Sequence, residues 1–243
     1  MADIKIAVLN QSTAVKDSEV EKVVGLLQIQ VTRDFAPVWG NNADLRFVPG
    51  GKKPKAGEWW LVILDNADQA GALGYHDVTN QGLPLGKVFA KTSMTYGEKW
   101  SVTASHELLE MLGDPEINLT VLVESGTGGT LYAYEVCDAC ESDKFGYKIK
   151  GVPVSDFVYP SWFESFRKKG DRFDFTKSVK QPFQLLAGGY IGVYDIKSGS
   201  GWKQQTAEKI NFRSRPPVGS RRERRNIPIS KRIASTAFSS KSR

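Results

Sequence analysis

The first 66 residues follow the order strand, helix, strand, strand, and this order most constrains how the chain can fold. Residues 4–10, "IKIAVLN", alternate as in a half-buried strand. Residues 17–39 place apolar side chains at helical spacing after an acidic first turn, and this helix is expected to end near Pro37. Further strands are expected at 43–49 and 58–66. We therefore predict an α/β (α+β) fold in which a long helix backs a twisted mixed sheet.

Length and composition favour one main domain. The chain has 243 residues, of which 40% are hydrophobic, enough to bury one substantial core. It contains no apolar run close to eighteen residues and does not start with a basic segment followed by a long apolar one, so we expect neither a membrane span nor a signal peptide. Two cysteines cannot form a disulfide framework for this size, which favours a reducing compartment. The predicted location is cytoplasmic or virion-associated.

The middle and end of the folded part give less regular signals. Residues 71–93 are expected to form an irregular loop that leads into an edge strand at 86–92. A helix is predicted over 99–115, ended by Gly-Asp-Pro. Residues 116–159 are expected to be largely irregular, with a loop at 124–130 and a short strand and turn within 131–141. A hairpin is expected within 146–163, with its turn at 149–152, and a short helix after 161. The last expected element is an extended or hairpin unit within 182–205.

The stretch "SHELLEMLGDPE", residues 105–116, carries the main chemical signal. In a helix, positions i and i+4 lie on one face, so His106 and Glu110 can contact one ion, while Glu107 can reach a water molecule bound to it. This is the geometry of the H-E-x-x-H zinc motif with a glutamate in place of the second histidine. A carboxylate oxygen binds zinc at a distance similar to that of an imidazole nitrogen, so the pattern predicts a metal site.

The match extends beyond the first five positions. Gly113 stands where the longer zinc motif needs a residue that lets the chain leave the helix sharply, and Glu116 occupies the third ligand position. The resulting H-E-x-x-E-x-x-G-x-x-E resembles the metzincin branch of the zincin metallopeptidases, over roughly residues 3–165. The resemblance implies a zincin-like domain, His106, Glu110 and Glu116 as ligands, Glu107 as general base, and a peptide substrate along the edge strand near 87–91.

Metzincins also carry a turn beneath the metal, with a methionine and sometimes a tyrosine that approaches the ion. The segment "VSDFVYP", residues 154–160, is similar in position. The resemblance implies that Tyr159 is the catalytic tyrosine, with Val158 or Phe157 where methionine is expected.

The replaced ligands leave the metal and the third ligand open. Two glutamates offset the charge of a divalent ion, make its bound water less acidic and favour harder cations. These ligands are compatible with calcium, magnesium or manganese. Zinc is the metal expected if the site is catalytic, and a site without metal is a further alternative. Asp138 or Glu135 could replace Glu116, because "YEVCDACE" supplies several ligand types. In the same segment, Cys137 and Cys140 are more typical of buried, unreactive cysteines than of a zinc site.

Both histidines also have simpler interpretations that involve no metal. His76 is expected to be a loop or edge-strand histidine bonded to Asp77, and only a second-rank ligand. His106, Glu107 and Glu110 would form an ordinary polar helix face if no metal is bound.

The C-terminal arm, residues 212–243, has a different composition. It contains ten Lys or Arg against one Glu, so it carries +9 and residues 1–211 carry −3 of the net +6. Such an arm can bind phosphates of nucleic acid or an acidic protein surface, or remain solvated without a partner.

The metal motif and the arm together indicate two candidate functions. One is a metal-dependent peptidase. The other is a catalytically inactive structural protein of a large assembly, such as a phage or virus particle, whose arm binds neighbouring subunits or nucleic acid.

Overall fold

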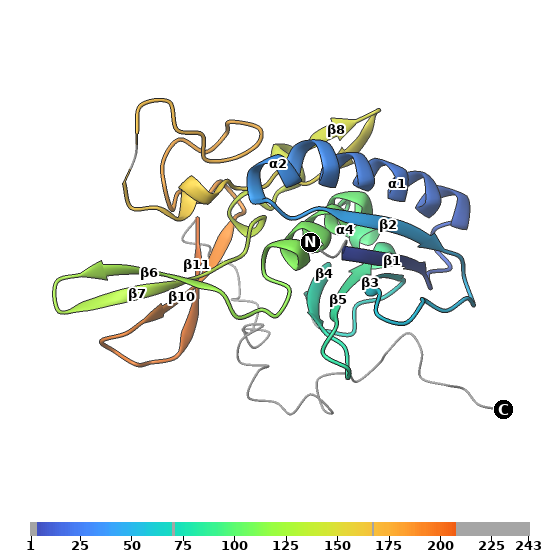
Figure 1. The fold of residues 1–243 in the computed structure, drawn as a ribbon, viewed down its shortest axis with the longest axis horizontal. Coiled ribbons are helices and arrows are strands. Elements are labelled where there is room, and N and C mark those ends of the chain that lie inside the picture. Colours follow the sequence, from blue (N-terminus) through green and yellow to red (C-terminus); the bar gives the residue numbers. More distant parts are fainter. Residues whose placement is uncertain (1–3, 70, 167, 208–243) are drawn as a thin grey trace.

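The computed structural model describes residues 4–69, 71–166 and 168–207, and the central element is a five-stranded mixed sheet (Figure 1). Its strands lie in the order β2-β1-β3-β5-β4. Neighbours from β2 to β5 are parallel, whereas β4 is antiparallel to β5. The strands are β1 (Ile4–Asn10), β2 (Ala43–Val48), β3 (Trp59–Leu64), β4 (Gly74–Val78) and β5 (Pro84–Phe89). The predicted α/β class with a mixed sheet is confirmed.

Two helices cover one face of this sheet (Figure 1). α1 (Asp17–Ile29) continues through a π-helix (Gln30–Phe35) into α2 (Ala36–Trp39). Gly40, with φ of 78°, then ends the helix in the left-handed conformation that glycine adopts without strain. α1 packs over β1 and β2, while α4 (Trp100–Gly113) packs over β3, β4 and β5 and is preceded by the short α3 (Ala90–Thr95).

One hydrophobic core joins both helices to the sheet. Ile6 and Val8 of β1, and Leu61 and Ile63 of β3, lie in the same cluster as buried side chains of α1 and α4. The alternate residues of β1 and β3 form a smaller cluster on the opposite face, which explains why these central strands are apolar on both sides: Ala7, Leu9 and Val62, with Val48 and Leu85.

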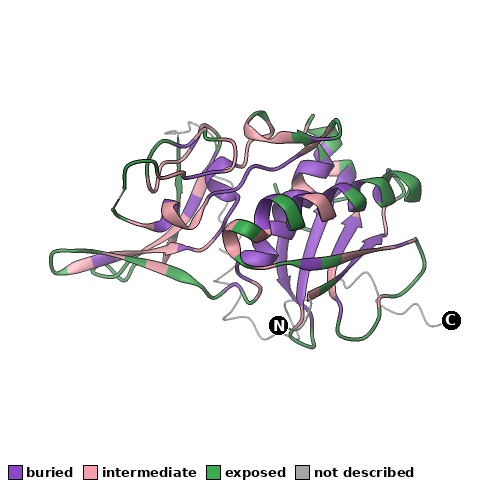
Figure 2. Cartoon of the chain, turned by 45° about the horizontal axis from the view of Figure 1, so that its top comes forward, coloured by how far each residue is buried: buried purple, intermediate pink, exposed green. Residues whose placement is uncertain are grey.

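α4 is buried around nearly its whole circumference, and the strands that it covers are also largely buried (Figure 2). Every residue of this helix except Thr103 is buried, including His106, Glu107 and Glu110. These three side chains therefore do not form a solvated polar face, and their charges and hydrogen-bonding groups must be accommodated inside the protein.

A second, antiparallel sheet follows in the chain, with the order β11-β10-β7-β6. Its strands are β6 (Thr120–Ser125), β7 (Gly128–Ala133), β10 (Tyr190–Asp195) and β11 (Trp202–Thr206). The connecting segment contains the hairpin β8 (Tyr147–Ile149) and β9 (Val152–Val154), and short 3₁₀ turns at Asp138–Cys140, Asp143–Phe145 and Pro160–Phe163. The fully buried Trp162 anchors a separate core in this region.

The structure corrects two sequence predictions. The edge strands are β2 and β4, whereas β5, which covers residues 86–89 of the edge strand predicted at 86–92, lies between β3 and β4. The reason is that β4 and β5 form a hairpin, and the parallel pairing with β3 goes to the more apolar second arm. Residues 120–133 form the hairpin β6–β7, so the predicted loop at 124–130 covers only its turn and adjoining strand ends.

Other predictions agree with the structure. The hairpin that turns within 149–152 is present as β8–β9, and the last unit within 182–205 is the hairpin β10–β11. The predicted arm at 212–243 lies outside the described residues. Among the residues described, no helix combines the length and apolarity that crossing a membrane requires.

Candidate metal centre

α4 supplies three of the side chains at the candidate site. His106 and Glu110 are one helical turn apart and lie on the same face, as the i and i+4 spacing predicts. Nε2 of His106 lies 3.1 Å from Oε1 of Glu110 and 3.2 Å from Oδ1 of Asp138. The three side chains are buried and offer ligand atoms within 4.8 Å of one another, so this group could hold a metal ion.

Asp138 comes from the segment that follows β7. This segment crosses close to the end of α4, because a Cβ on Gly113 would lie only 2.9 Å from Cγ1 of Val136. The backbone N–H of Cys137 donates to Oε1 of Glu110 at 3.4 Å, which ties the segment to the helix. Gly113 is thus required for the close approach of Val136, and it lies within the helix rather than in a left-handed exit turn.

The geometry of this first group fits a small cation. In a tetrahedral site with metal–ligand distances near 2.1 Å, neighbouring ligand atoms lie about 3.4 Å apart. The observed 3.1 and 3.2 Å are close to that value, and without a metal they also suit one Nε2–H of His106 shared between the two carboxylates. Burial, the largest effect, lowers the pKa of His106, but the carboxylates of Glu110 and Asp138 together raise this pKa well above its usual value. A proton therefore competes with a metal at this site.

A second group lies directly beside the first. His76, in the edge strand β4, is fully buried, and its Nδ1 lies 3.5 Å from Oε2 of Glu110 and 3.8 Å from Oε2 of Glu107. These three residues also offer ligand atoms within 4.8 Å of one another. Nε2 of His76 faces Glu135 at 3.9 Å. Glu110 therefore belongs to both groups, one carboxylate oxygen facing each.

Glycines in the sheet make room for the second group. A Cβ on Gly74 would lie 2.8 Å from Cγ and Oε1 of Glu107, and a Cβ on Gly86 would lie 3.6 Å from Cβ of Glu107 and 2.7 Å from a Leu61 methyl carbon. In β4 and β5, Gly86 is paired with His76. The absence of side chains at these positions lets α4 approach the sheet closely enough for Glu107 to reach the histidine.

The structure does not bring every predicted residue to these groups. Glu116 is exposed and accepts a hydrogen bond from the side chain of Asn118 at 3.0 Å, outside both groups. The chain turns there because Asp114 accepts backbone hydrogen bonds from Asn118 and Leu119. Tyr159 stacks with Phe157, with ring centroids 5.9 Å apart, and its role as the catalytic tyrosine stays a prediction.

The cysteines of the 131–141 segment are both free and buried. Burial is the main cause that raises the pKa of the Cys137 and Cys140 thiols well above their usual value, which disfavours the thiolate that zinc requires. Within the described part of the chain, the two groups able to hold a metal contain histidines and carboxylates only.

His76 is the member of these groups that sequence reasoning ranked too low, and Glu135, which lies 3.9 Å from His76, was predicted only as an alternative third ligand. Each is separated from α4 by more than twenty residues, so helical spacing carries no signal for them. For His76, the available hint was the glycine within each of "GYHD" and "PLGK", Gly74 and Gly86, because glycine in a strand often marks close approach by another element.

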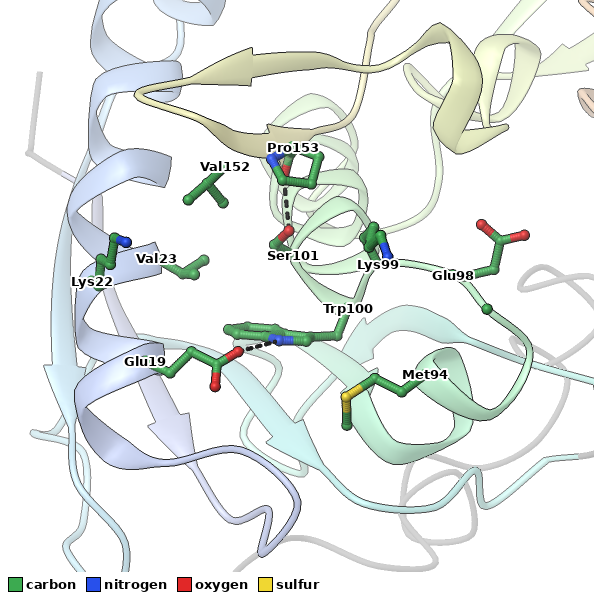
Figure 3. Close-up of a pocket in the computed structure, with 11 residues that line it drawn as sticks. Glu19, Lys22, Val23, Met94, Glu98, Lys99, Trp100, Ser101, Val152 and Pro153 are labelled. Carbon is green, nitrogen blue, oxygen red and sulfur yellow. Dashed lines mark hydrogen bonds between the residues drawn. The ribbon is translucent and has the colours of Figure 1, made fainter.

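A surface hollow of about 490 Å³ lies elsewhere, at the start of α4 (Figure 3). Trp100 forms part of its wall and donates a hydrogen bond from Nε1 to Glu19 of α1 at 3.0 Å. Ser101 donates to the carbonyl of Pro153 at 2.8 Å. None of the five residues of the two buried groups lines this hollow, so we do not assign it to the metal centre.

Comparison of the chain with known protein families, curated proteins and solved structures gave no match. We therefore infer the function from the geometry of the site.

Proposed function

We propose that the protein is a metal-dependent hydrolase of the zincin peptidase type, with a divalent cation held by His106, Glu110 and Asp138. The observation that carries the proposal is that these three buried side chains converge. Nε2 of His106 lies 3.1 Å from Oε1 of Glu110 and 3.2 Å from Oδ1 of Asp138. Asp138 takes the position of third ligand that the motif alone gave to Glu116. When bound, such an ion supplies Lewis acidity, polarising a carbonyl oxygen and lowering the pKa of water.

The residues around this site support a role in peptide hydrolysis. Glu107 follows His106 on α4, and its carboxylate is buried on the side of the helix that faces β4. In the proposal Glu107 accepts the proton of the attacking water. β4 is the edge strand nearest to α4, and an extended peptide can add to an edge strand through backbone hydrogen bonds.

The ligand set narrows the choice of metal. One imidazole and two carboxylates combine a ligand typical of zinc with ligands typical of manganese, magnesium and calcium. We propose zinc or manganese, because imidazole ligation disfavours the two alkaline-earth ions.

The test is metal content by mass spectrometry on the purified full chain. We expect at least one zinc or manganese ion per chain in the wild type and one ion fewer per chain in His106→Gln and Asp138→Asn, which keep similar side-chain volumes. Glu116→Gln is the matched control, since this exposed carboxylate lies outside the site and its loss should leave the metal content unchanged. Peptide cleavage that disappears in Glu107→Gln would support catalysis. A wild-type chain without metal would refute the proposal.

A second candidate function has an observation of its own. The side chains of the two groups are at most 7% exposed, and closed metal sites are typical of structural rather than catalytic ions. In this alternative the ion stabilises the fold, the protein is catalytically inactive, and it acts as a component of a larger assembly. The two functions are separated by exchange of water or small anions at a bound Mn²⁺, which only an open site permits.

The partner proposed for the arm at 212–243 can be tested independently. We propose that its positive charges bind nucleic acid phosphates or an acidic subunit surface. Binding to nucleic acid that weakens steeply with salt, and that disappears when residues 212–243 are deleted, would support phosphate recognition. Unchanged binding after the deletion would exclude the arm as the contact.

A further inference from the structure

The carboxylate of Glu110 stands between two histidines. Its Oε1 lies 3.1 Å from Nε2 of His106, and its Oε2 lies 3.5 Å from Nδ1 of His76. The side chain is completely buried, so both oxygens are held inside the protein. A carboxylate placed in this way can bind one cation through each oxygen.

The spacings around His76 differ from those around His106. Distances of 3.5 and 3.8 Å from Nδ1 to Glu110 and Glu107 exceed the usual 2.7–3.2 Å of a direct hydrogen bond. They are close to the separation of about 3.4 Å expected for neighbouring ligands of one tetrahedral ion. The second group therefore has the dimensions of a metal site in its own right.

The formal charge of the two groups points to the number of ions. Four buried carboxylates, from Glu107, Glu110, Glu135 and Asp138, surround two imidazoles. With neutral histidines the formal charge is −4, and one divalent cation leaves −2 in an environment where charge is expensive. Two divalent cations bring the formal charge to zero.

The remaining nitrogen of His76 also suits metal ligation. A histidine that binds a metal through one ring nitrogen usually directs the N–H of the other toward a carboxylate, which orients the ring and selects its tautomer. Nε2 of His76 faces Oε2 of Glu135 at 3.9 Å. At 3.9 Å this separation exceeds a direct hydrogen bond, so Glu135 contributes a negative charge beside Nε2, while Nδ1 is the nitrogen that faces Glu107 and Glu110.

We propose that the protein holds two divalent first-row cations, bridged by Glu110: the first bound by His106 and Asp138, the second by His76 and Glu107. This inference deepens the proposed function and rests on it for the first cation. In the two-cation state Glu107 is a ligand rather than a free base. Two ions about 3.5–4 Å apart can stabilise both the attacking and the leaving group of a hydrolysis, as in two-metal aminopeptidases.

The test uses Mn²⁺ as the probe on the full-length chain, with metal removed beforehand. Manganese per chain is measured by mass spectrometry, and low-temperature electron paramagnetic resonance detects coupling between neighbouring ions. We expect about two ions per chain and a coupled spectrum in the wild type. His76→Gln and Asp138→Asn should each retain about one ion with an uncoupled, six-line spectrum. Glu116→Gln should retain two, and circular dichroism checks that each variant is folded.

The outcomes separate the two proposals. One uncoupled ion in the wild type, kept in His76→Gln and lost in Asp138→Asn, would overturn the two-cation site and leave the proposed function standing. No ion in the wild type would overturn both. Two ions that persist in His76→Gln would show that the second lies elsewhere, and would overturn this assignment.

Discussion

Replacing Gly74 with alanine tests directly whether the fit between β4 and α4 builds the site. The new Cβ would lie 2.8 Å from Cγ and Oε1 of Glu107 and 2.8 Å from Cγ2 of Thr103. The end of the Glu107 side chain can rotate away, but Cγ is closer to the backbone and Thr103 is β-branched and stiff. Either β4 moves away from α4 or Glu107 leaves His76.

The size of the effect follows from two opposing terms. Overpacking typically costs about 1–3 kcal/mol, while alanine in place of glycine restricts the unfolded chain and returns about 0.4–1 kcal/mol. We expect a net loss of about 1–2 kcal/mol in the free energy of unfolding, which lowers the melting temperature by roughly 2–8 °C for a domain of this size. Bound manganese should fall toward one ion per chain, because Glu107 no longer reaches the second site.

Gly25→Ala is the matched control. Gly25 is an exposed residue within α1, and a Cβ there would meet nothing within 4 Å. The same chemical change should therefore stabilise the protein by about 1 kcal/mol through helix propensity. Thermal unfolding followed by circular dichroism and metal content measure both variants. A Gly74→Ala protein as stable as Gly25→Ala, with unchanged metal content, would refute the argument.

Three further predictions concern charge, metal and core. Burial and the neighbouring Asp174 raise the pKa of Asp156 to about 8. Between the unfolded pKa near 4 and about 8, the folded state therefore binds more protons than the unfolded state. The free energy of unfolding should fall as pH rises through this range, by at most about 1.4 kcal/mol per pH unit. Asp156→Asn should flatten this slope in urea unfolding at pH 5 and pH 8, and an unchanged slope would exclude the assignment. Metal at 100 times its dissociation constant should raise the free energy of unfolding by about 2.7 kcal/mol per bound ion in thermal scans, and the gain should be smaller in Asp138→Asn, which loses the first ion; an equal gain in both proteins would contradict the proposed ligand. Trp162→Ala should lower the free energy of unfolding in urea by about 3–5 kcal/mol, because Trp162 is fully buried and donates a hydrogen bond to the carbonyl of Gln184 at 2.9 Å. Trp202→Ala is the control and should cost less, because Trp202 is only half-buried. Equal losses would count against Trp162 as the anchor of its core.

Local periodicity was sufficient for much of the fold. The alternation in 4–10 and the helical spacing after Asp17 predicted β1 and α1. The segment around Gly151 predicted the β8–β9 hairpin, because glycine allows the positive φ of 84° found at its turn. The 3.6-residue period also placed His106 and Glu110 on one face of α4, since residues four apart in a helix are neighbours whatever surrounds them.

Tertiary structure decided what faces that helix. The order of β4 and β5 depends on which arm of a hairpin pairs with β3, and both arms are compatible with the local sequence. The choice of Asp138 over Glu116 depends on the segment after β7 crossing the end of α4 at Gly113. These are packing contacts between residues far apart in the chain, and local spacing carries no information about them. By itself, the sequence determined that α4 presents a histidine and a glutamate on one face; only packing decided that His76 approaches Glu110 from the other side.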